Sequence, residues 1–140
     1  MSKVAVVYYS GTGNTEKMAQ AVAAGAEGAG AEVTTLTSDA FAGTDVMNYD
    51  AIAFGCPAMG AEVLEETTFE PMFTEAEGLL GGKKVAIFGS YGWGDGQWMR
   101  DWQDRCAADG IALVDDGLIA NNEPDEEALA ACEALGAKLA

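Results

Sequence analysis

The stretch Val4-Ala5-Val6-Val7-Tyr8-Tyr9-Ser10-Gly11-Thr12-Gly13-Asn14-Thr15 decides the fold of this chain. An apolar run typical of a buried strand passes into a loop of glycine, hydroxyl and amide residues, and residues 16–22 then look helical. A loop of this kind at a helix N-terminus points several backbone N–H groups into one concavity. The loop therefore predicts a binding site for a phosphate or a similar anion, formed by Ser10, Gly11, Thr12, Gly13, Asn14 and Thr15.

Basic residues are missing from this loop, and Lys17, the nearest one, lies within the predicted helix. The loop is not a Walker A motif, because no Gly-Lys-Ser/Thr follows it. It is not the dinucleotide fingerprint either, because Glu16 stands where the third glycine would be. An ordinary capped turn between a strand and a helix is the structural alternative, but the density of glycine and hydroxyl residues favours phosphate binding.

The composition limits the classes of partner. The chain has 140 residues, 23 acidic side chains against seven basic ones, and a net charge of −16. The length suits a single domain over residues 1–140, and the charge excludes nucleic acid and anionic membranes as partners. No apolar run reaches the roughly 20 residues that span a bilayer, and no signal peptide is evident, so we expect a soluble, cytoplasmic monomer. The acidic surface serves either solubility or docking to basic proteins.

Several other residues of note are expected to have structural roles. Cys56, Cys106 and Cys132 show no CxxC spacing and the chain has no histidine, which predicts buried free thiols rather than a disulfide, a metal site or a nucleophile. Core packing is expected for Trp98, Met99 and Trp102 on a helix and for Phe41, Val46 and Met47 in a connecting segment. Arg100 and Arg105 are expected to be solvated or paired with Asp101 and Asp104.

Apolar runs alternate with helical patterns along the chain. Strands are predicted at residues 4–9, 32–37, 50–56 and 84–89, with an interrupted last strand at 111–114 and 117–120. Helices are predicted at residues 14–29, 66–78, 96–109 and 125–139, the last one capped by Asp125 or an adjacent residue. This alternation predicts an α/β fold with a five-stranded parallel sheet of order 2-1-3-4-5 and helices on both faces. Ligands bind such sheets beyond the carboxyl ends of the strands, where we expect the loops after the first, third and fourth strands to meet.

The loops after the third and fourth strands carry unusual side chains. The first reads Gly55-Cys56-Pro57-Ala58-Met59-Gly60-Ala61-Glu62, and the second reads Gly89-Ser90-Tyr91-Gly92-Trp93-Gly94-Asp95-Gly96. Each offers a flat or polarizable side chain, Met59 or Trp93, among residues that allow close backbone approach. A tryptophan that only fills a surface gap is the structural alternative. Together with the phosphate loop, the two loops predict a site for a planar aromatic ring on a phosphorylated tail.

In these three loops the chain resembles a short-chain flavodoxin of the anaerobic bacterial type. The resemblance extends over essentially the whole chain, including Glu65-Glu66, Glu70-Pro71 and Asn122-Glu123-Pro124-Asp125. It implies a three-layer flavodoxin-like sandwich that binds FMN non-covalently. It further implies a low-potential one-electron carrier that works between the semiquinone and the hydroquinone and shuttles electrons between redox proteins, with basic redox proteins as partners.

The resemblance also implies a role for each loop. Residues 10–15 would hold the FMN phosphate, and Met59 and Trp93 would flank the two faces of the isoalloxazine. Glu62 would accept a hydrogen bond from N3–H, and backbone amides of residues 89–94 would contact the N1/O2 edge. The Gly60-Ala61 peptide matches the redox switch of the family, although Ala61 departs from the Asp or Gly that is frequent there. The implied contacts in the second and third loops are Pro57, Ala58, Met59, Gly60, Ala61, Glu62, Ser90, Tyr91, Gly92, Trp93 and Gly94.

Acidic residues around this site would make the second electron strongly reducing, because negative charge raises the energy of an anionic hydroquinone. The residues concerned are Glu62, Glu65, Glu66 and Asp95. The alternative is an FMN-dependent quinone or disulfide reductase on the same scaffold, which would need a substrate pocket over the flavin and usually longer insertions. The chain has no room for a second lobe, so we predict an electron-transfer protein rather than an enzyme, without catalytic residues and without a metal.

Overall fold

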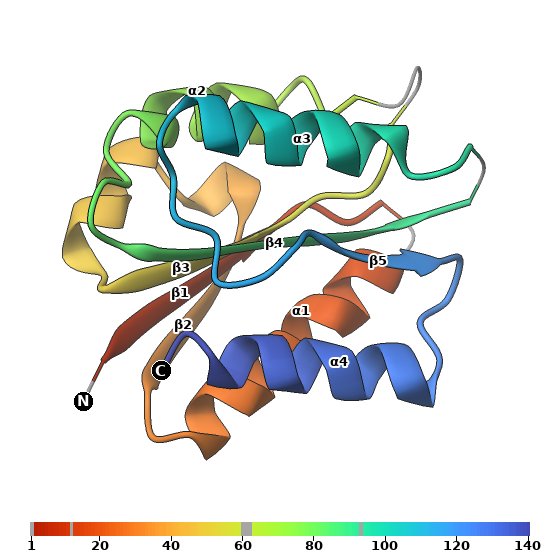
Figure 1. Cartoon of the computed structure of the whole chain (residues 1–140), viewed down its shortest axis with the longest axis horizontal. Helices are drawn as coiled ribbons and strands as arrows, with labels where there is room; N and C mark the ends of the chain where they lie inside the picture. Colours follow the sequence, from red (N-terminus) through yellow and green to blue (C-terminus); the bar gives the residue numbers. More distant parts are fainter. Residues whose placement is uncertain (1, 12, 60–62, 93) are drawn as a thin grey trace.

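A five-stranded parallel sheet forms the middle layer of the protein (Figure 1). The computed structural model describes residues 2–11, 13–59, 63–92 and 94–140. The strands are β1 (Lys3–Tyr8), β2 (Glu32–Thr37), β3 (Ala51–Gly55), β4 (Lys84–Tyr91) and β5 (Leu118–Asn121). Their order in the sheet is β2-β1-β3-β4-β5, which confirms the predicted fold class and topology. The connections after β1 and β3 run to opposite sides of the sheet, so the two connections diverge beyond the carboxyl ends of these paired strands.

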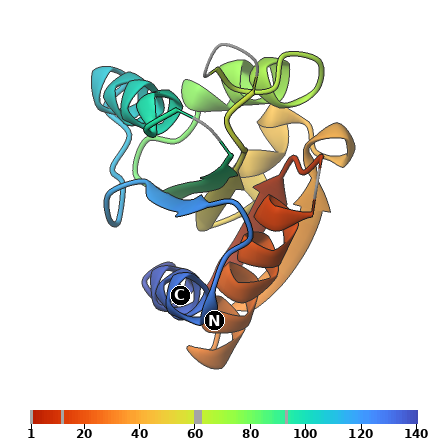
Figure 2. The same ribbon diagram turned by 90° about the vertical axis from the view of Figure 1, so that its right-hand side faces the viewer.

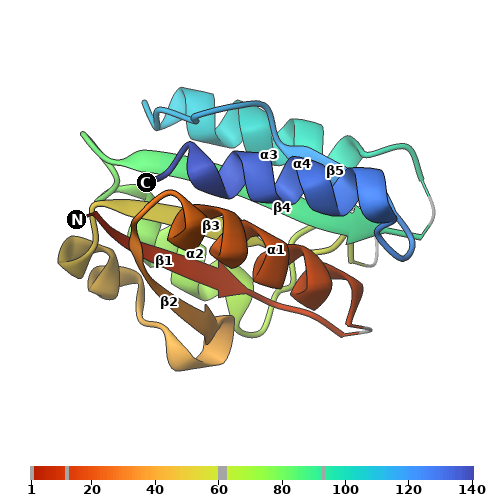
Figure 3. The same cartoon turned by 90° about the horizontal axis from the view of Figure 1, so that it is seen from below.

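Four helices cover the sheet, two on each face (Figures 1 and 3). Helices α1 (Asn14–Gly28) and α4 (Glu126–Ala137) pack on one face, and α2 (Phe69–Glu77) and α3 (Gln97–Ala108) pack on the other. Two short 3₁₀ helices, η1 (Ser38–Ala40) and η2 (Gly43–Asn48), connect β2 to β3. In the part of the chain that the structure describes, no helix is both long enough and apolar enough to cross a membrane.

The α1/α4 face of the sheet is lined mostly by alanine and valine side chains, with Phe88 as its one fully buried ring among the described strand residues. Because successive strand residues point to opposite faces, β3 places Ala51 and Ala53 here and β4 places Ala86 here. Helices α1 and α4 approach each other closely: a Cβ added at Gly25 would lie 1.9 Å from the backbone oxygen of Glu133. A Cβ added at Gly136 would lie 1.9 Å from the backbone oxygen of Val22. The absence of a side chain at these two positions therefore sets the distance between the helices.

The α2/α3 face is filled by large aromatic rings. The ring centroids of Phe54 on β3 and Phe73 on α2 are 5.1 Å apart at an interplanar angle of 90°. Phe69 and Phe73 each meet Trp102 on α3 edge to face, with centroids 5.5 and 5.7 Å apart. Such T-shaped contacts stabilise the fold beyond the burial of apolar area alone.

Trp98, Met99 and Trp102 are buried as predicted, and so are the free thiols of Cys56, Cys106 and Cys132.

The structure corrects several details of the sequence-based predictions. Met47 is 63% exposed, so of the three predicted anchors of the β2–β3 connection only Phe41 and Val46 are buried. The predicted strand at 111–114 is reduced to one bridge between Val85 and Leu113.

The arginine partners also differ from the prediction. Arg100 is exposed, as the solvated alternative predicted, and pairs with Asp95. Arg105 pairs with Glu70 and Glu77 on α2 instead of Asp101 or Asp104. Arg105 therefore joins α3 to α2 across the aromatic face. The predicted N-cap of α4 is present, because the Asp125 side chain accepts a hydrogen bond from the Ala128 amide.

Candidate functional site

The loops after β1, β3 and β4 begin side by side at the carboxyl edge of the sheet, which faces the viewer in Figure 2. Hydrogen bonds continue the ladder beyond the strands. The Tyr9 amide donates to the Gly55 carbonyl at 2.9 Å, and the Ala58 amide donates to the Ser90 carbonyl at 3.1 Å. Backbone pairing therefore brings together the three loops that the sequence singled out.

The loop after β1 leads into α1, whose N-cap residue, Gly13, has no side chain to cap the helix. Gly13 precedes α1 with φ of +94°, a conformation that glycine adopts without strain. The Ser10 hydroxyl accepts hydrogen bonds from the amides of Gly13 and Glu16, at 3.0 and 3.2 Å. The amides of Asn14 and Thr15 belong to the first turn, which offers them no acceptor within the helix. Thr12, the remaining residue of this predicted site, lies outside the described residues.

The Thr15 and Ser90 side chains join the start of α1 to the end of β4, which extends to Tyr91 rather than to the predicted residue 89. Their hydroxyl oxygens are 3.1 Å apart, and the Ser90 amide donates to Thr15 Oγ1 at 3.3 Å. Both side chains are almost fully buried. Two predicted site residues that are far apart in the sequence thus form one buried polar contact behind the loop.

The basic residue nearest to the loop in sequence is engaged elsewhere. The Lys17 ammonium forms an ion pair with Glu123 at 2.9 Å, and both side chains are exposed. A ligand at residues 10–15 would therefore meet hydroxyls and amides rather than a cationic side chain from this loop. Such donors fit a phosphate group at a helix N-terminus. There is also room in front of the loop, because a Cβ at Gly11 or Gly13 would meet nothing within 4 Å.

The loop after β3 is folded back on itself. Met59 and Val63 exchange two backbone hydrogen bonds of 3.0 Å and form an antiparallel bridge, which we call the Met59–Val63 turn. Pro57, Ala58 and Met59 are half-buried at its start, and Val63 is 41% exposed at its end. The predicted switch residues Gly60 and Ala61 and the predicted acceptor Glu62 lie outside the described residues.

The end of β4, from which the next loop starts, is supported by α3 and by the residues after β5. Tyr91 is half-buried and its ring contacts Trp98 on α3, with centroids 5.5 Å apart. Gly92 and Gly94 are exposed, and Trp93 lies outside the described residues. The backbone amide of Asn122 donates a hydrogen bond to the Tyr91 carbonyl at 2.7 Å.

Asn122 was not among the predicted site residues. A Cβ added at Gly92 would lie 3.3 Å from its side-chain oxygen, so Asn122 faces the loop after β4 closely. Its φ of +57° is a left-handed conformation that asparagine tolerates better than most residues. An asparagine directly after the last strand was the signal in the sequence that could have indicated this turn.

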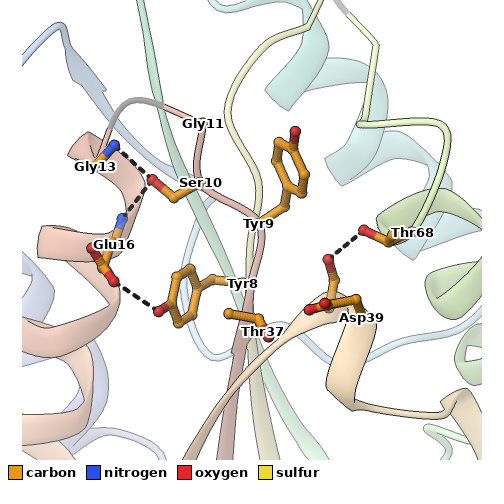
Figure 4. A pocket seen from close by; sticks show the side chains of 10 residues that line it. Tyr8, Tyr9, Ser10, Gly11, Gly13, Glu16, Thr37, Asp39 and Thr68 are labelled. Atoms are coloured by element: carbon orange, nitrogen blue, oxygen red, sulfur yellow. Dashed lines mark hydrogen bonds between the residues drawn. The ribbon is translucent and has the colours of Figure 1, made fainter.

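A pocket of about 430 Å³ flanks the loop after β1 (Figure 4). The Tyr8 hydroxyl donates to the Glu16 carboxylate at 3.1 Å within it, and burial together with this bond raises the Tyr8 pKa. Of the described residues after β3 and β4, only Thr68, directly before α2, lines this pocket, and the predicted ring contacts Pro57, Ala58 and Met59 do not. The sequence did not indicate that the end of β2, helix η1 and Thr68, the residue before α2, contribute to it. The lining consists of Tyr8, Tyr9, Ser10, Gly11, Gly13, Glu16, Thr37, Ser38, Asp39 and Thr68.

A doubly wound parallel sheet with a hydroxyl- and glycine-lined loop at its switch point defines an α/β protein built to bind a phosphorylated ligand. The Flavodoxin family model matches residues 6–136. The chain is 49% identical to the flavodoxin of Clostridium beijerinckii over 135 residues, which are 96% of this chain and 97% of the relative. It is 44% identical to the flavodoxin of Megasphaera elsdenii over 133 residues, 95% of each chain.

A solved structure agrees with these similarities. The solution structure of two-electron reduced flavodoxin from Megasphaera elsdenii matches the fold with a TM-score of 0.88 at 43% identity, over 97% of both chains. The chain belongs to the flavodoxin family. It is an FMN-containing, low-potential electron carrier rather than an enzyme, which confirms the predicted function and cofactor.

Proposed function

We propose that the three loops at the carboxyl edge of the sheet hold FMN, and that the protein passes single electrons between redox proteins of the cytoplasm as a monomeric, single-domain carrier. Residues 10–15 would hold the phosphate, Met59 and Trp93 would flank the ring, and Glu62 would accept a hydrogen bond from it. The other contacts would come from Pro57, Ala58, Gly60, Ala61, Ser90, Tyr91, Gly92 and Gly94.

The observation that supports this proposal best is the pairing of the loops with one another. Ser90 connects to Thr15 through its amide and hydroxyl and to Ala58 through its carbonyl. A single residue thus contacts both the proposed phosphate loop and the segment that leads to Met59. A ligand with a phosphate at one end and a ring at the other fits a site assembled in this way.

FMN, when bound, supplies one-electron redox chemistry, and the residues of the chain hold it and shape its surroundings. The amides and hydroxyls of the first loop would fix the tail. The apolar side chains of Met59 and Trp93 would exclude water from the ring, which strengthens electrostatic interactions there. The glycine at position 60 would let the following peptide change its orientation at little cost.

Negative charge around the site supports a low redox potential, but one of the acids named from the sequence, Asp95, contributes less than expected. Asp95 forms an ion pair with Arg100 at 3.0 Å, so its charge is partly neutralised. Glu66 is exposed, whereas Glu65 is buried and carries no ion pair within the described residues. Glu65 is therefore the described acid of this region best placed to oppose added negative charge.

Electrostatics also supports docking of basic redox proteins. A net charge of −16 attracts a positively charged partner and speeds its association, most strongly at low ionic strength. Exposed Val63, which bridges to Met59 of the proposed ring site, offers an apolar contact to such a partner.

Substitution of Ser10 tests the proposed phosphate loop. Ser10→Ala removes the hydroxyl that orders the amides of Gly13 and Glu16, whereas Ser10→Thr keeps a hydroxyl and serves as the matched control. We expect Ser10→Ala to weaken FMN binding about tenfold, because lost hydrogen bonds to a charged group are worth about 1.5–3 kcal/mol. The measurement is the recovery of flavin fluorescence when holoprotein is diluted, combined with displacement by riboflavin, which lacks the phosphate.

The ratio of FMN affinity to riboflavin affinity decides the outcome. Ser10→Ala should lower this ratio and Ser10→Thr should preserve most of it. An unchanged ratio in Ser10→Ala would contradict the proposed role of the loop.

A further inference from the structure

Glu65 is a buried carboxylate directly after the turn that Met59 and Val63 close. Only 5% of the residue is exposed. One carboxylate oxygen accepts hydrogen bonds from the Thr68 amide at 2.8 Å, the Thr68 hydroxyl at 2.9 Å and the Phe69 amide at 2.9 Å. The other oxygen accepts from the Thr67 amide at 2.8 Å and from the Thr67 hydroxyl. Glu65 therefore satisfies the free amides at the start of α2.

Hydrogen bonding keeps this carboxylate ionised in spite of its burial. Burial alone would raise the Glu65 pKa, but the bonds from Thr67, Phe69 and Thr68 outweigh it and lower the pKa from 4.5 to about 2. In contrast to Glu70 and Glu77, which pair with Arg105, Glu65 forms no ion pair with a described lysine or arginine. Its charge is thus balanced by hydrogen-bond donors alone.

Two further contacts tie Glu65 to the loops of the proposed site. The Glu65 amide donates to Cys56 Sγ at 3.3 Å, and the Trp98 indole N–H donates to the Cys56 carbonyl at 3.0 Å. The Trp98 ring contacts Tyr91, the last residue of β4. Glu65, Cys56 and Trp98 form what we call the Glu65 clamp, which connects the loop after β3, the start of α2 and the end of β4.

The geometry of the clamp points to a function for it. We propose that Glu65 is a positioning residue, which anchors the Met59–Val63 turn in the place that it needs to hold the FMN ring; this rests on the proposed function. The turn is fixed on its first side by the bond between the Ala58 amide and the Ser90 carbonyl. On its other side only Leu64 separates Val63 from Glu65. Loss of the carboxylate would release that second side.

Glu65→Gln tests the proposal with little change in shape, and Glu66→Gln is the matched control. Both remove one negative charge from neighbouring positions, but Glu66 is exposed and takes no part in the clamp. Both variants should shift the midpoint potentials of the holoprotein to more positive values. Only Glu65→Gln should weaken the binding of flavin, by about tenfold, because its amide N–H₂ group would face backbone donors instead of accepting from them.

The riboflavin comparison separates this proposal from the proposed phosphate site. Glu65→Gln should weaken FMN and riboflavin equally and leave their affinity ratio unchanged, since the clamp acts on the ring side. If Ser10→Ala leaves the ratio unchanged, the phosphate assignment fails whatever Glu65 does. If Ser10→Ala behaves as expected and Glu65→Gln binds both flavins like the wild type, Glu65 is a structural cap only.

Two additional measurements keep the test decisive if Glu65→Gln folds poorly. Thr67→Val removes one hydroxyl donor at an exposed position and should weaken both flavins by a smaller factor, about threefold. The wild-type protein should also lose stability as the pH falls from about 4.5 toward 2, because a lowered pKa stabilises the fold above that window only. Thr67→Val with wild-type affinity, or no difference between wild type and Glu65→Gln in this pH window, would overturn the proposal.

Discussion

The two faces of the sheet are packed by side chains of different size. On one face, alanines and two glycines let α1 and α4 lie close to each other and to the strands. On the other, Phe54, Phe69, Phe73 and Trp102 fill the space under α2 and α3. Both buried anchors of the proposed ring site, Glu65 and Trp98, belong to the aromatic side. The comparison teaches that the two faces support different loops: α1 on the small-residue face supports the loop after β1 through Thr15, and the aromatic face supports the loop after β3 and the end of β4 through Glu65 and Trp98.

The largest effect on this comparison is expected from Phe73→Ala. Phe73 is fully buried and contacts Phe54, Phe69 and Trp102, and the Arg105 guanidinium lies 4.9 Å from its ring centre. Truncation should lower the free energy of unfolding by about 3–5 kcal/mol, measured by urea denaturation. Phe73→Leu, which keeps most of the apolar volume, should cost clearly less. Similar losses for both variants would indicate that ring geometry, rather than volume, stabilises this face.

Gly136→Ala should show that, whereas the aromatic face is destabilised by lost volume, the α1/α4 face is destabilised by added volume. There the addition of one methyl group is harmful, because the new Cβ would collide with the backbone oxygen of Val22. We expect a loss of about 1–3 kcal/mol in unfolding free energy. Gly28→Ala is the control, since a Cβ there would meet nothing within 4 Å and the same change should be neutral or stabilising. Equal effects at the two glycines would refute the close-packing argument.

The smallest effect comes from a pair of identical substitutions within the aromatic face. The Trp98 indole N–H donates to the Cys56 carbonyl, whereas the buried Trp102 indole N–H has no partner among the described residues. Trp98→Phe and Trp102→Phe remove similar volume, but only the first leaves an acceptor without its donor. Trp98→Phe should be more destabilising by about 1 kcal/mol.

Flavin release provides a second readout for this pair of variants. Trp98→Phe should also speed FMN release from the holoprotein, because Trp98 belongs to the Glu65 clamp, and Trp102→Phe should not. Indistinguishable variants would remove Trp98 from the clamp.

Local patterns predicted most of the fold, and contacts between distant residues explain what they missed. The bounds of β2 at Glu32–Thr37 agree with the prediction, because Gly30 ends the preceding helix and the strand residues then alternate between polar and apolar. Helix α2 begins at Phe69 rather than at residue 66, because the segment before it bends around the Glu65 carboxylate. The stretch 111–114 is as apolar as a strand, yet it pairs with β4 at one residue only.

The same limit applies to the site. Glycine and hydroxyl residues identified the three loops, since their local chemistry is unusual in sequence. The Glu65 clamp could not be inferred, because it depends on Cys56 and Trp98, which are respectively nine and 33 positions away in the chain. Asn122 was missed for the same reason: its importance depends on where β5 ends beside β4.

The pairing of α1 with α4 has a consequence for how the chain is made. These helices are separated in sequence by β2 to β5, yet they cover one face of the sheet together. During synthesis on the ribosome, the apolar surface of Val22 and Ala26 must wait for the last helix to emerge, and exposed surface of this kind promotes aggregation. The excess of acidic residues would keep unfinished chains apart during that interval, before any flavin is bound.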